Sequence, residues 1–409
     1  MDILYVSHCI PWPPDKGDRI RAYHSVRTLA DHHRVHLACL ARTAQEAAAV
    51  SPLRDRCASV AIEVMDKGPA MLRGLWSLAR GGSFTTAFHA VPALRAHVQW
   101  IVREQPIRAV VLLSSSMATF APAGLPFIAD WGDVDSEKRF QYARMRLGGF
   151  AHGLEGQRLR RVERDYALRS RRTFLTTPNE LRLFRGIAPQ APLGCAGNGI
   201  DTDTFDPAAG FDVPADLRRR KFLVFVGMLS YFPNSDGIVW FADAVFPELR
   251  RNHPDLELLV VGRNPGAAVE KLAARDGVVV VGEVKDVRPY LAAARGVIAP
   301  LRIARGIQNK VLEALAMGKT VLASGETCQT FQPDLPAGVV CCRSVQDYVE
   351  AVRNLPDTEA ANMSIVVATR AKFGWADNLA PLVAELSGIE QEAMASAPPG
   401  GTRANPAGS

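Results

Sequence analysis

The sequence has no run of about 18 uninterrupted apolar residues, and no basic segment followed by a long apolar stretch at its start. A transmembrane helix and a signal peptide are therefore not expected, and we expect a cytoplasmic protein. Contact with the inner face of the cytoplasmic membrane stays open, because the formal net charge of +6 favours anionic partners.

Aromatic residues are scarce, at 7% of 409 residues, and they form no pattern typical of RNA-binding sheets. The sequence also lacks the pattern of a DNA-recognition helix and the cysteine and histidine spacing of zinc sites. We therefore expect neither a nucleic-acid partner nor a bound metal ion.

Cysteine is rare as well, and no CxxC pair occurs. The seven cysteines are Cys9, Cys39, Cys57, Cys195, Cys328, Cys341 and Cys342. Because they are scattered, odd in number and mostly in apolar segments, we expect thiols that pack as small buried hydrophobic side chains in a reducing compartment.

The chain is too long for one ordinary hydrophobic core and fits two domains. Short apolar segments alternate with helical patterns in both halves, which predicts parallel sheets covered on both faces. We therefore predict an α/β protein with two Rossmann-like domains facing a cleft. The expected parts are an N-terminal domain (1–195), a linker (196–216), a C-terminal domain (217–372), a terminal helix (373–388) and a disordered tail (389–409).

The strands of both domains follow from these apolar segments. In the first domain they are expected at Ile3–Ser7, Val35–Leu40, Val60–Val64, Ala109–Leu113, Phe127–Asp130 and Phe174–Thr177. In the second they are expected at Phe222–Val226, Leu256–Val261, Val278–Val281, Val297–Ala299, Thr320–Ala323 and Val339–Cys342.

The segment from Gly306 to Ala323 predicts a glycine turn, a short helix and an apolar strand. Gly306 would let the backbone approach a ligand, and the amides of the following helix start favour a diphosphate. Lys310 adds a positive charge, and Glu313 lies three residues further on the same helix face, where it could accept hydrogen bonds from ribose hydroxyls. The alternative is a surface helix with a Lys–Glu pair.

Further donor-binding candidates stand in the loops that follow the predicted strands of the second domain, or at the start of this helix. They are Gly227, Asn234, Gly262, Arg263, Val284, Ile307, Gln308 and Asn309. Ligands are expected there because the carboxyl ends of parallel strands meet at one edge of the sheet.

Acceptor-binding candidates stand in two loops of the first domain. Gly17 permits a tight turn into a helix, Asp18 is a fair N-cap, and Arg19 and Arg21 near that start could meet a phosphate; a solvated helix start is the alternative. After the strand Phe127–Asp130, Asp133 and Asp135 could bind acceptor hydroxyls or the transferred sugar, or else form an N-cap cluster for a helix beginning at Ser136. We do not expect this pair to hold manganese, because its loop lies in the half opposite the donor helix.

A basic run follows in the same domain and could touch anionic lipid, although most such runs are solvated faces. Its members are Arg158, Arg160, Arg161, Arg164, Arg169, Arg171 and Arg172.

The segment LEALAMGKTVLA resembles the donor site of retaining glycosyltransferases with two Rossmann-like domains (GT-B fold, family 4). Glu313 matches the second Glu of the family pattern, which binds ribose, whereas Arg305 stands where the family has its first Glu. The basic pair that follows the glycine matching Gly227 is missing here, and Arg305 with Lys310 could supply that charge. The loop Gly282–Val287 resembles the family loop that contacts the nucleotide base.

Three longer segments resemble a narrower subgroup, the sugar transferases associated with the exosortase A (PEP-CTERM) system and exopolysaccharide loci. They are PPDKGDRIRAYH, DVDSEKRFQYA and APLRIARGIQNKVLEALAMG. The resemblance implies an acceptor-binding first domain and a second domain that binds a nucleotide diphosphate sugar.

The implied reaction transfers the sugar with retention to a glycan or lipid-linked acceptor, without metal or other cofactor. Arg305, Lys310 and Glu313 are the predicted catalytic set, and the leaving phosphate itself would take the acceptor proton. The alternatives are a sugar-nucleotide epimerase of the same fold, for which His8 is the best-placed histidine, and a non-catalytic nucleotide-sugar-binding regulator of polysaccharide assembly.

Overall fold

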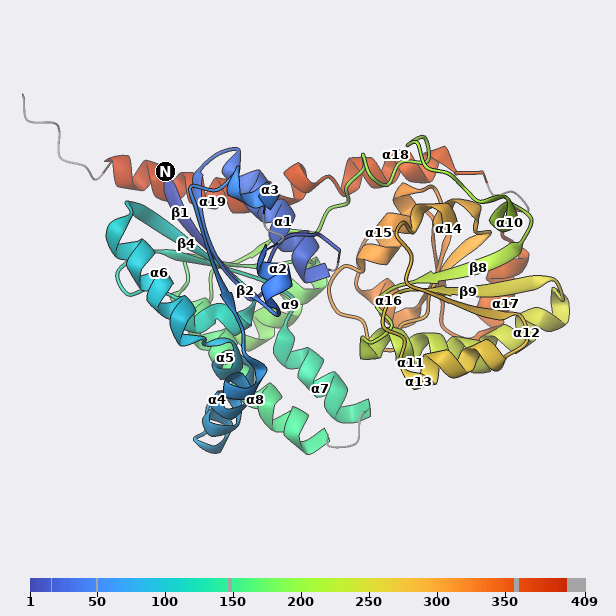
Figure 1. Ribbon diagram of the computed structural model, residues 1–409, viewed down its shortest axis with the longest axis horizontal. Coiled ribbons are helices and arrows are strands. Elements are labelled where there is room, and N and C mark those ends of the chain that lie inside the picture. Colours follow the sequence, from blue (N-terminus) through green and yellow to red (C-terminus); the bar gives the residue numbers. More distant parts are fainter. Residues whose placement is uncertain (16, 49–50, 146–148, 357–359, 396–409) are drawn as a thin grey trace, which may run out of the picture.

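The computed structural model describes residues 1–15, 17–48, 51–145, 149–356 and 360–395, which form two α/β units (Figure 1). Sheet A has seven parallel strands in the order β3-β2-β1-β4-β5-β6-β7, and sheet B has six in the order β10-β9-β8-β11-β12-β13. Both orders reverse direction once, between β1 and β4 in sheet A and between β8 and β11 in sheet B. The predicted fold class, two Rossmann-like units, is confirmed.

The elements of the first unit are β1 (Asp2–Ser7), α1 (Gly17–Ala30), β2 (Arg34–Ala41), α2 (Ala44–Ala48), α3 (Ser51–Arg54), β3 (Ser59–Val64), α4 (Lys67–Ala79), α5 (Phe84–His89), α6 (Pro92–Glu104), β4 (Ile107–Leu113), η1 (Ser115–Phe120), β5 (Phe127–Gly132), α7 (Asp135–Met145), α8 (Gly149–Arg169), β6 (Arg172–Leu175), α9 (Pro178–Ile187) and β7 (Leu193–Cys195). Those of the second are α10 (Ala215–Arg218), β8 (Lys221–Val226), α11 (Phe232–Trp240), η2 (Phe241–Val245), α12 (Phe246–Asn252), β9 (Leu256–Val261), α13 (Ala267–Glu270), η3 (Lys271–Ala274), β10 (Val278–Gly282), α14 (Arg288–Ala293), β11 (Gly296–Ala299), α15 (Asn309–Ala316), β12 (Val321–Ser324), α16 (Gly325–Gln329), β13 (Val339–Cys342) and α17 (Val345–Arg353). Helices α18 (Met363–Lys372) and α19 (Trp375–Ala395) follow.

Every strand predicted from an apolar segment is present, but one of them ends early. Strand β6 stops at Leu175, because the Thr177 side chain accepts a hydrogen bond from the Glu180 amide and caps α9. The predicted strand Phe174–Thr177 is therefore wrong at its end. Strand β7 was not predicted, and neither were helices α2, α3, α4, α5, α9, α10, α16 and α18.

Both sheets are covered on both faces, and β1 shows how. Ile3 and Tyr5 belong to one buried cluster, with α1 and α19, whereas Leu4 and Val6 belong to another on the opposite face of sheet A. Strands buried on both faces are continuous apolar runs, and for this reason the strands were easy to predict.

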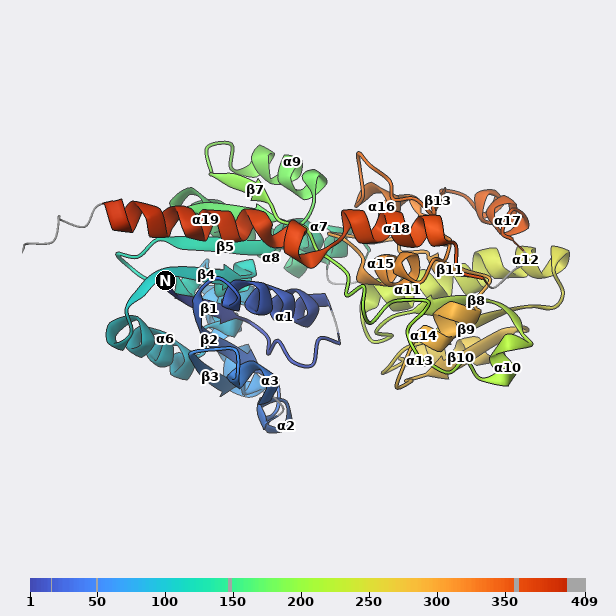
Figure 2. The same ribbon diagram turned by 90° about the horizontal axis from the view of Figure 1, so that it is seen from above.

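Helices α18 and α19 run along both units in succession (Figure 2). Helix α18 lies on the second unit, and α19 returns to the first, where Trp375, Leu382 and Ile389 join the buried cluster around β1. The predicted tail start at residue 389 is wrong, because Ile389 is buried and the helix continues to Ala395. The remaining predicted tail, 396–409, lies outside the described residues.

One cysteine prediction is also wrong. Cys328 at α16 and Cys341 on β13 form a disulfide, with their Cα atoms 6.1 Å apart, because α16 follows the strand that pairs with β13. The other five cysteines are free. Within the described part of the chain, no helix has the length and apolar character needed to span a bilayer.

Candidate functional site

Helix α15 begins at the carboxyl end of sheet B, next to the point where the strand order reverses. The preceding loop turns at Gly306, whose φ is +58°, and the Gln308 side chain donates to the Arg305 carbonyl at 2.9 Å, which fixes this loop. Gln308 forms no side-chain cap of the helix. The predicted glycine turn and short helix are thus confirmed, and no side chain caps the start of α15.

Two predicted donor residues, Gly227 and Asn234, meet the predicted catalytic Lys310 of α15. Lys310 Nζ donates to Asn234 Oδ1, and Asn234 Nδ2 donates to the Met228 carbonyl at 2.9 Å. A side chain at Gly227 would place its Cβ 2.9 Å from Asn234 Nδ2 and 3.0 Å from Lys310 Nζ. Gly227 therefore leaves the space that brings backbone, amide and amine together.

Burial shifts both titratable groups of this cluster toward neutrality. It lowers the pKa of Lys310 to about 7 and raises the pKa of Glu313 to about 7, and in each case the charge of the other residue opposes the shift. The Lys310 amine also lies 4.5 Å from the centre of the Phe225 ring. A bound diphosphate would restore the positive charge of Lys310, because an anion favours the protonated amine.

The loops after β8, β9 and β10 are joined through glycine. Gly227 donates its amide to Val261, and Gly262 donates to Gly282 at 2.7 Å. A Cβ on Gly262 would lie only 1.7 Å from the Gly227 carbonyl oxygen. Gly262 thus holds the donor loops together rather than facing a ligand, and Val284 packs against the core of the second unit.

Asn309, the first residue of α15, has a side chain without a partner. Its Oδ1 and Nδ2 atoms are both buried and form no hydrogen bond within the described residues. Gly17 of the first unit stands opposite: a Cβ there would lie 3.7 Å from Asn309 Nδ2. An unpaired amide in the cleft is available to bind a ligand from either side.

Arg305, the predicted catalytic arginine, instead faces acids of the first unit. Its Nη1 lies 3.2 Å from Glu180 Oε1, and its Nη2 lies 3.8 Å from Glu137 Oε2. Glu180 also accepts from the Val134 amide at 2.8 Å. Burial, followed by the nearby Asp133 charge, raises the pKa of Glu180 to about 7. Glu180 was not among the predicted site residues, although its place three residues after Thr177 fits a helix-capping box.

Asp133 lies against Gly306 across the cleft. A Cβ on Gly306 would be 1.9 Å from Asp133 Oδ1, which accepts a hydrogen bond from Thr176 Oγ1 at 3.0 Å. Asp135, the second predicted acidic residue, accepts from Ser115 Oγ at 2.8 Å at the start of α7. The structure therefore brings Asp133 to the donor loop and leaves Asp135 within the first unit.

Two more contacts join the units. Arg263 Nη2, predicted to bind donor, lies 2.6 Å from Asp15 Oδ2 in the proline-rich loop after β1. Lys138 Nζ lies 5.3 Å from the centre of the Tyr231 ring, which belongs to the loop after β8. Both contacts therefore link the first unit to the loops of the second.

The predicted acceptor arginines turn inward. Arg21 uses all five N–H groups on Asp130, Ala196, Gly197 and Asn198, so it has none left for an acceptor. Arg19 is buried and pairs with Asp15 and Glu46. Most of these partners, Asp130, Asn198 and Glu46 among them, are distant in sequence, whereas Asp15 lies only four residues before Arg19. Asp18 accepts from the Arg19 amide at 3.0 Å and lies 3.6 Å from His8 Nε2.

One group of side chains in the described residues has the composition of a metal site. Ligand atoms of His8, Cys9 and Asp18 lie within 4.8 Å of one another. Burial raises the pKa of the Cys9 thiol well above its usual range. The thiol would have to lose its proton before it could bind a metal ion.

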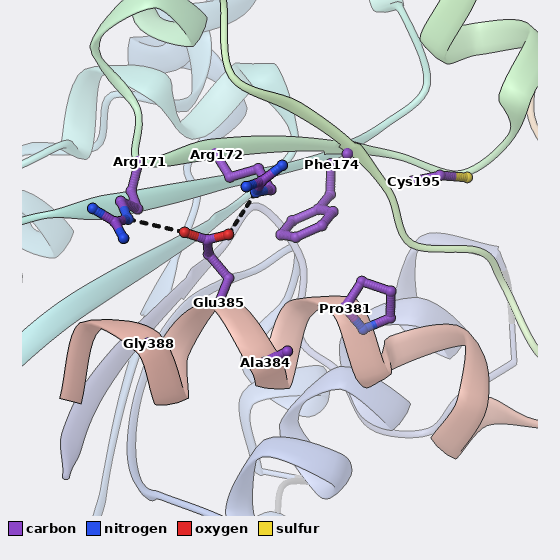
Figure 3. A pocket seen from close by; sticks show the side chains of 9 residues that line it. Arg171, Arg172, Phe174, Cys195, Pro381, Ala384, Glu385 and Gly388 are labelled. Carbon is purple, nitrogen blue, oxygen red and sulfur yellow. Dashed lines mark hydrogen bonds and ion pairs between the residues drawn. The ribbon is translucent and has the colours of Figure 1, made fainter. Parts of the chain in front are cut away.

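Two cavities accompany the cleft. One of about 260 Å³ lies between the units and is lined by Thr177, Ile307, Phe331, Lys372 and Asn378, among others. The other, of about 370 Å³, lies away from the cleft between sheet A and α19, where Glu385 binds both Arg171 and Arg172 (Figure 3). Of the two, only the first adjoins a predicted donor residue, Ile307.

The sequence of the second unit matches a known family. Residues 220–357 match the family described as glycosyl transferases group 1. Among the curated proteins, no sequence matches the chain significantly.

Solved structures match nearly the whole chain. Sucrose-phosphate synthase from Thermosynechococcus elongatus has a TM-score of 0.69 at 15% identity, covering 97% of this chain and 100% of that one. Anabaena HepE in complex with UDP and glucose has a TM-score of 0.64 at 14% identity, covering 95% and 100%. A putative UDP-N-acetylglucosamine 2-epimerase from Listeria monocytogenes has a TM-score of 0.59 at 11% identity, covering 96% and 97%. The chain therefore has the GT-B fold, and its residues 220–357 match the glycosyl transferases group 1 family.

Proposed function

We propose that this protein is a retaining glycosyltransferase of family 4, of the hexosyltransferase type. It would transfer a sugar from a nucleotide diphosphate sugar to a glycan or lipid-linked acceptor. One observation carries the proposal: Gly227, Asn234 and Lys310 converge beside Glu313 at the strand-order reversal of a unit that matches glycosyl transferases group 1. The HepE complex with UDP and glucose supports a nucleotide-sugar ligand for this fold.

The donor would bind along the start of α15. The helix dipole and Lys310 would hold the diphosphate, and Glu313 would accept hydrogen bonds from ribose hydroxyls. The unpaired Asn309 amide would bind a polar group of the donor or of the incoming acceptor. Gly227 keeps the space for this approach.

Catalysis would rest on stabilising the leaving group. The bond from the anomeric carbon to the diphosphate breaks, the acceptor oxygen bonds to that carbon on the same face, and the acceptor proton passes to the departing phosphate oxygen. Lys310 and the α15 start would stabilise the charge that grows on the diphosphate. The bridging contacts between the units would exclude water, and we propose no metal or other cofactor.

Arg305 would help to stabilise the leaving diphosphate only after it breaks its ion pairs with acids of the first unit. Glu180 and Glu137 balance its charge in the structure, so contact with a diphosphate requires a change of partner. The Arg305→Glu variant tests this role through donor affinity. Unchanged affinity would exclude Arg305 from the diphosphate site and leave it as a contact between the units.

The decisive experiment measures release of nucleoside diphosphate from a panel of UDP-, GDP- and ADP-sugars, with and without a lipid extract as acceptor source. We expect release that depends on acceptor and is abolished in Glu313→Ala. Glu350→Ala, an exposed change on α17, is the matched control and should leave release intact. Equal release by both variants would overturn the assignment.

Two alternatives give different products in the same experiment. The first alternative is an epimerase, the activity named for the structurally similar Listeria protein. An epimerase would convert the sugar nucleotide without releasing nucleoside diphosphate. A regulator would bind a nucleotide sugar and leave it unchanged. Product analysis by mass spectrometry and chromatography separates all three.

The cellular setting is proposed on the resemblance of the three longer segments. The enzyme would act in exopolysaccharide synthesis linked to the exosortase A system, in the cytoplasm at the inner face of the membrane. A deletion strain that keeps its full polysaccharide output would contradict this setting without affecting the proposed reaction.

A further inference from the structure

Helix α4 exposes its large apolar side chains and buries its small ones. The exposed fractions are 46% for Met71, 69% for Leu72, 51% for Leu75 and 62% for Trp76. Only Ala70 and Gly74 are buried, and a Cβ on Gly74 would lie 2.4 Å from the Phe84 ring. The helix thus packs on the protein through small residues, the reverse of an ordinary surface helix.

The four exposed side chains form one face, since their spacing repeats after four residues. Basic residues stand at both ends of this face: Lys67 in the first turn and Arg80 after the last, with the Arg80 guanidinium 4.5 Å from the centre of the Trp76 ring. No acidic residue occurs from Lys67 to Arg80. Asp66 caps the helix beside Lys67, but the three basic residues Lys67, Arg73 and Arg80 outnumber it, so the surface is apolar in its middle and positive overall.

The helix is held firmly from behind. Arg73 donates to the Ala87 and Phe88 carbonyls, and Arg158 of α8 donates to the Leu78 and Gly82 carbonyls. Figure 1 shows α4 at the lower edge of the first unit, beside α5 and α8 and away from the second unit. The apolar face is consequently preformed and lies apart from the cleft.

We propose that α4 docks the protein onto an anionic lipid bilayer. Leu72, Leu75 and Trp76 enter the boundary between headgroups and acyl chains, while Lys67 and Arg80 stay at the level of the anionic headgroups. An anionic bilayer fits this surface because it offers acyl chains to the exposed Leu72, Leu75 and Trp76 and negative headgroups to a helix on which basic residues outnumber the single acidic cap. The expected binding to vesicles does not depend on the proposed transferase activity. Its purpose, access to a lipid-linked acceptor, rests on the proposed function.

This surface differs from the basic run in which the sequence placed membrane contact. Much of that run is engaged within the protein: Arg160 binds Glu137, Arg164 binds Asp165, and Arg171 and Arg172 bind Glu385. The run also lacks an apolar stripe of the size that α4 carries. It could therefore attract anionic headgroups, but it has no such stripe to insert among the acyl chains.

The test sediments the full-length protein with vesicles of phosphatidylcholine alone or mixed with phosphatidylglycerol, without nucleotide sugar. We expect binding to the mixed vesicles, reduced about tenfold or more in the Leu72→Glu/Trp76→Glu variant. Lys67→Gln/Arg80→Gln should lose the preference for phosphatidylglycerol. Val367→Glu, which changes a 63% exposed side chain on α18, and Arg161→Gln/Arg164→Gln are matched controls that should bind like wild type.

Three results would overturn the proposal. Wild type could fail to bind either vesicle, the α4 variant could bind as well as wild type, or only the Arg161/Arg164 variant could lose binding. If wild type were a dimer in size-exclusion chromatography and the α4 variant a monomer, the apolar face of α4 would instead bind a second copy of the chain. UDP binding and the melting temperature of the α4 variant, expected unchanged, separate this outcome from failure of the fold or of the proposed transferase.

Discussion

Both units carry basic residues at the start of a helix near the cleft, and the two starts behave in opposite ways. In α15 of the second unit, Lys310 stays beside glycine and an unpaired amide, with burial lowering its pKa to about 7. In α1 of the first unit, Arg21 is buried and fully bonded to Asp130 and the connection after β7. One start is arranged for a ligand and the other for holding the protein together.

The difference lies in what surrounds each cation. Among the described residues, the hydrogen-bond partner of Lys310 is the neutral Asn234, so a diphosphate would add a strong negative charge beside the amine. Arg21 has a buried carboxylate at 3.1 Å from its Nε. A cation that is already neutralised gains little from a ligand, because it would have to abandon a buried partner. The second unit therefore holds the stronger candidate site.

The largest expected effect concerns the structural cation. Arg21→Met should lower the free energy of unfolding by about 3–5 kcal/mol, because it leaves the Asp130 carboxylate buried without its partner. Urea denaturation measures this loss. Arg108→Met, an exposed change on β4, is the control and should stay within about 0.5 kcal/mol of wild type. A small loss at Arg21 would mean that it is free to serve a ligand after all.

This pair also shows what the sequence reveals. The strands and the glycine turn at Gly306 could be predicted because apolar runs and glycines act locally. The partners of Arg21 and Arg305 could not be predicted, because Asp130 and Glu180 lie 109 and 125 residues away in sequence. The local sequence pattern does not indicate such distant contacts. The exposed face of α4 was missed for another reason: its pattern resembles a buried helix, and only packing shows which side faces out.

The second expected effect concerns the ligand-facing cation. Lys310→Met should reduce kcat/KM for the donor roughly a hundredfold, since it removes one charge from the leaving diphosphate, while stability should hardly change. Lys271→Met, which removes an exposed lysine of the same unit, is the control. Steady-state kinetics over a range of donor concentrations would decide it. If Lys310→Met lost stability but kept its activity, Lys310 would be a structural residue and not a ligand-binding one.

The contact between the units gives a third prediction. Gly306→Ala should reduce kcat/KM about tenfold, because its positive φ strains alanine by about 1 kcal/mol and its Cβ meets Asp133. In an Asp133→Gly background the collision disappears and only the backbone strain remains, so the loss should shrink. Equal losses in both backgrounds would mean that Asp133 does not limit the approach of the donor loop.

The pH dependence of donor binding follows from the two shifted groups. Below about pH 7 Lys310 is already protonated, whereas above it the free protein must take up a proton to bind, so affinity falls by up to about tenfold per pH unit. Glu313, raised to about 7, loses its carboxylate as pH falls, which weakens ribose binding on the acid side. UDP titration by calorimetry should show a maximum near pH 7. Lys310→Met should lack the alkaline decline, and an unchanged decline would assign it to another group.

The smallest expected effect belongs to Arg263, which the sequence assigned to the donor and the structure pairs with Asp15 across the cleft. Both side chains keep about a third of their surface in solvent, at 31% and 27%, so the pair should contribute only about 0.5 kcal/mol to closure. Arg263→Gln should therefore weaken UDP binding about twofold, and less at high salt. Arg251→Gln, which breaks an exposed pair inside the second unit, is the control and should leave UDP binding unchanged. A loss near that of Lys310→Met would mean that Arg263 leaves Asp15 for the diphosphate, and the ligand-facing part of the second unit would then extend from α15 to the loop after β9.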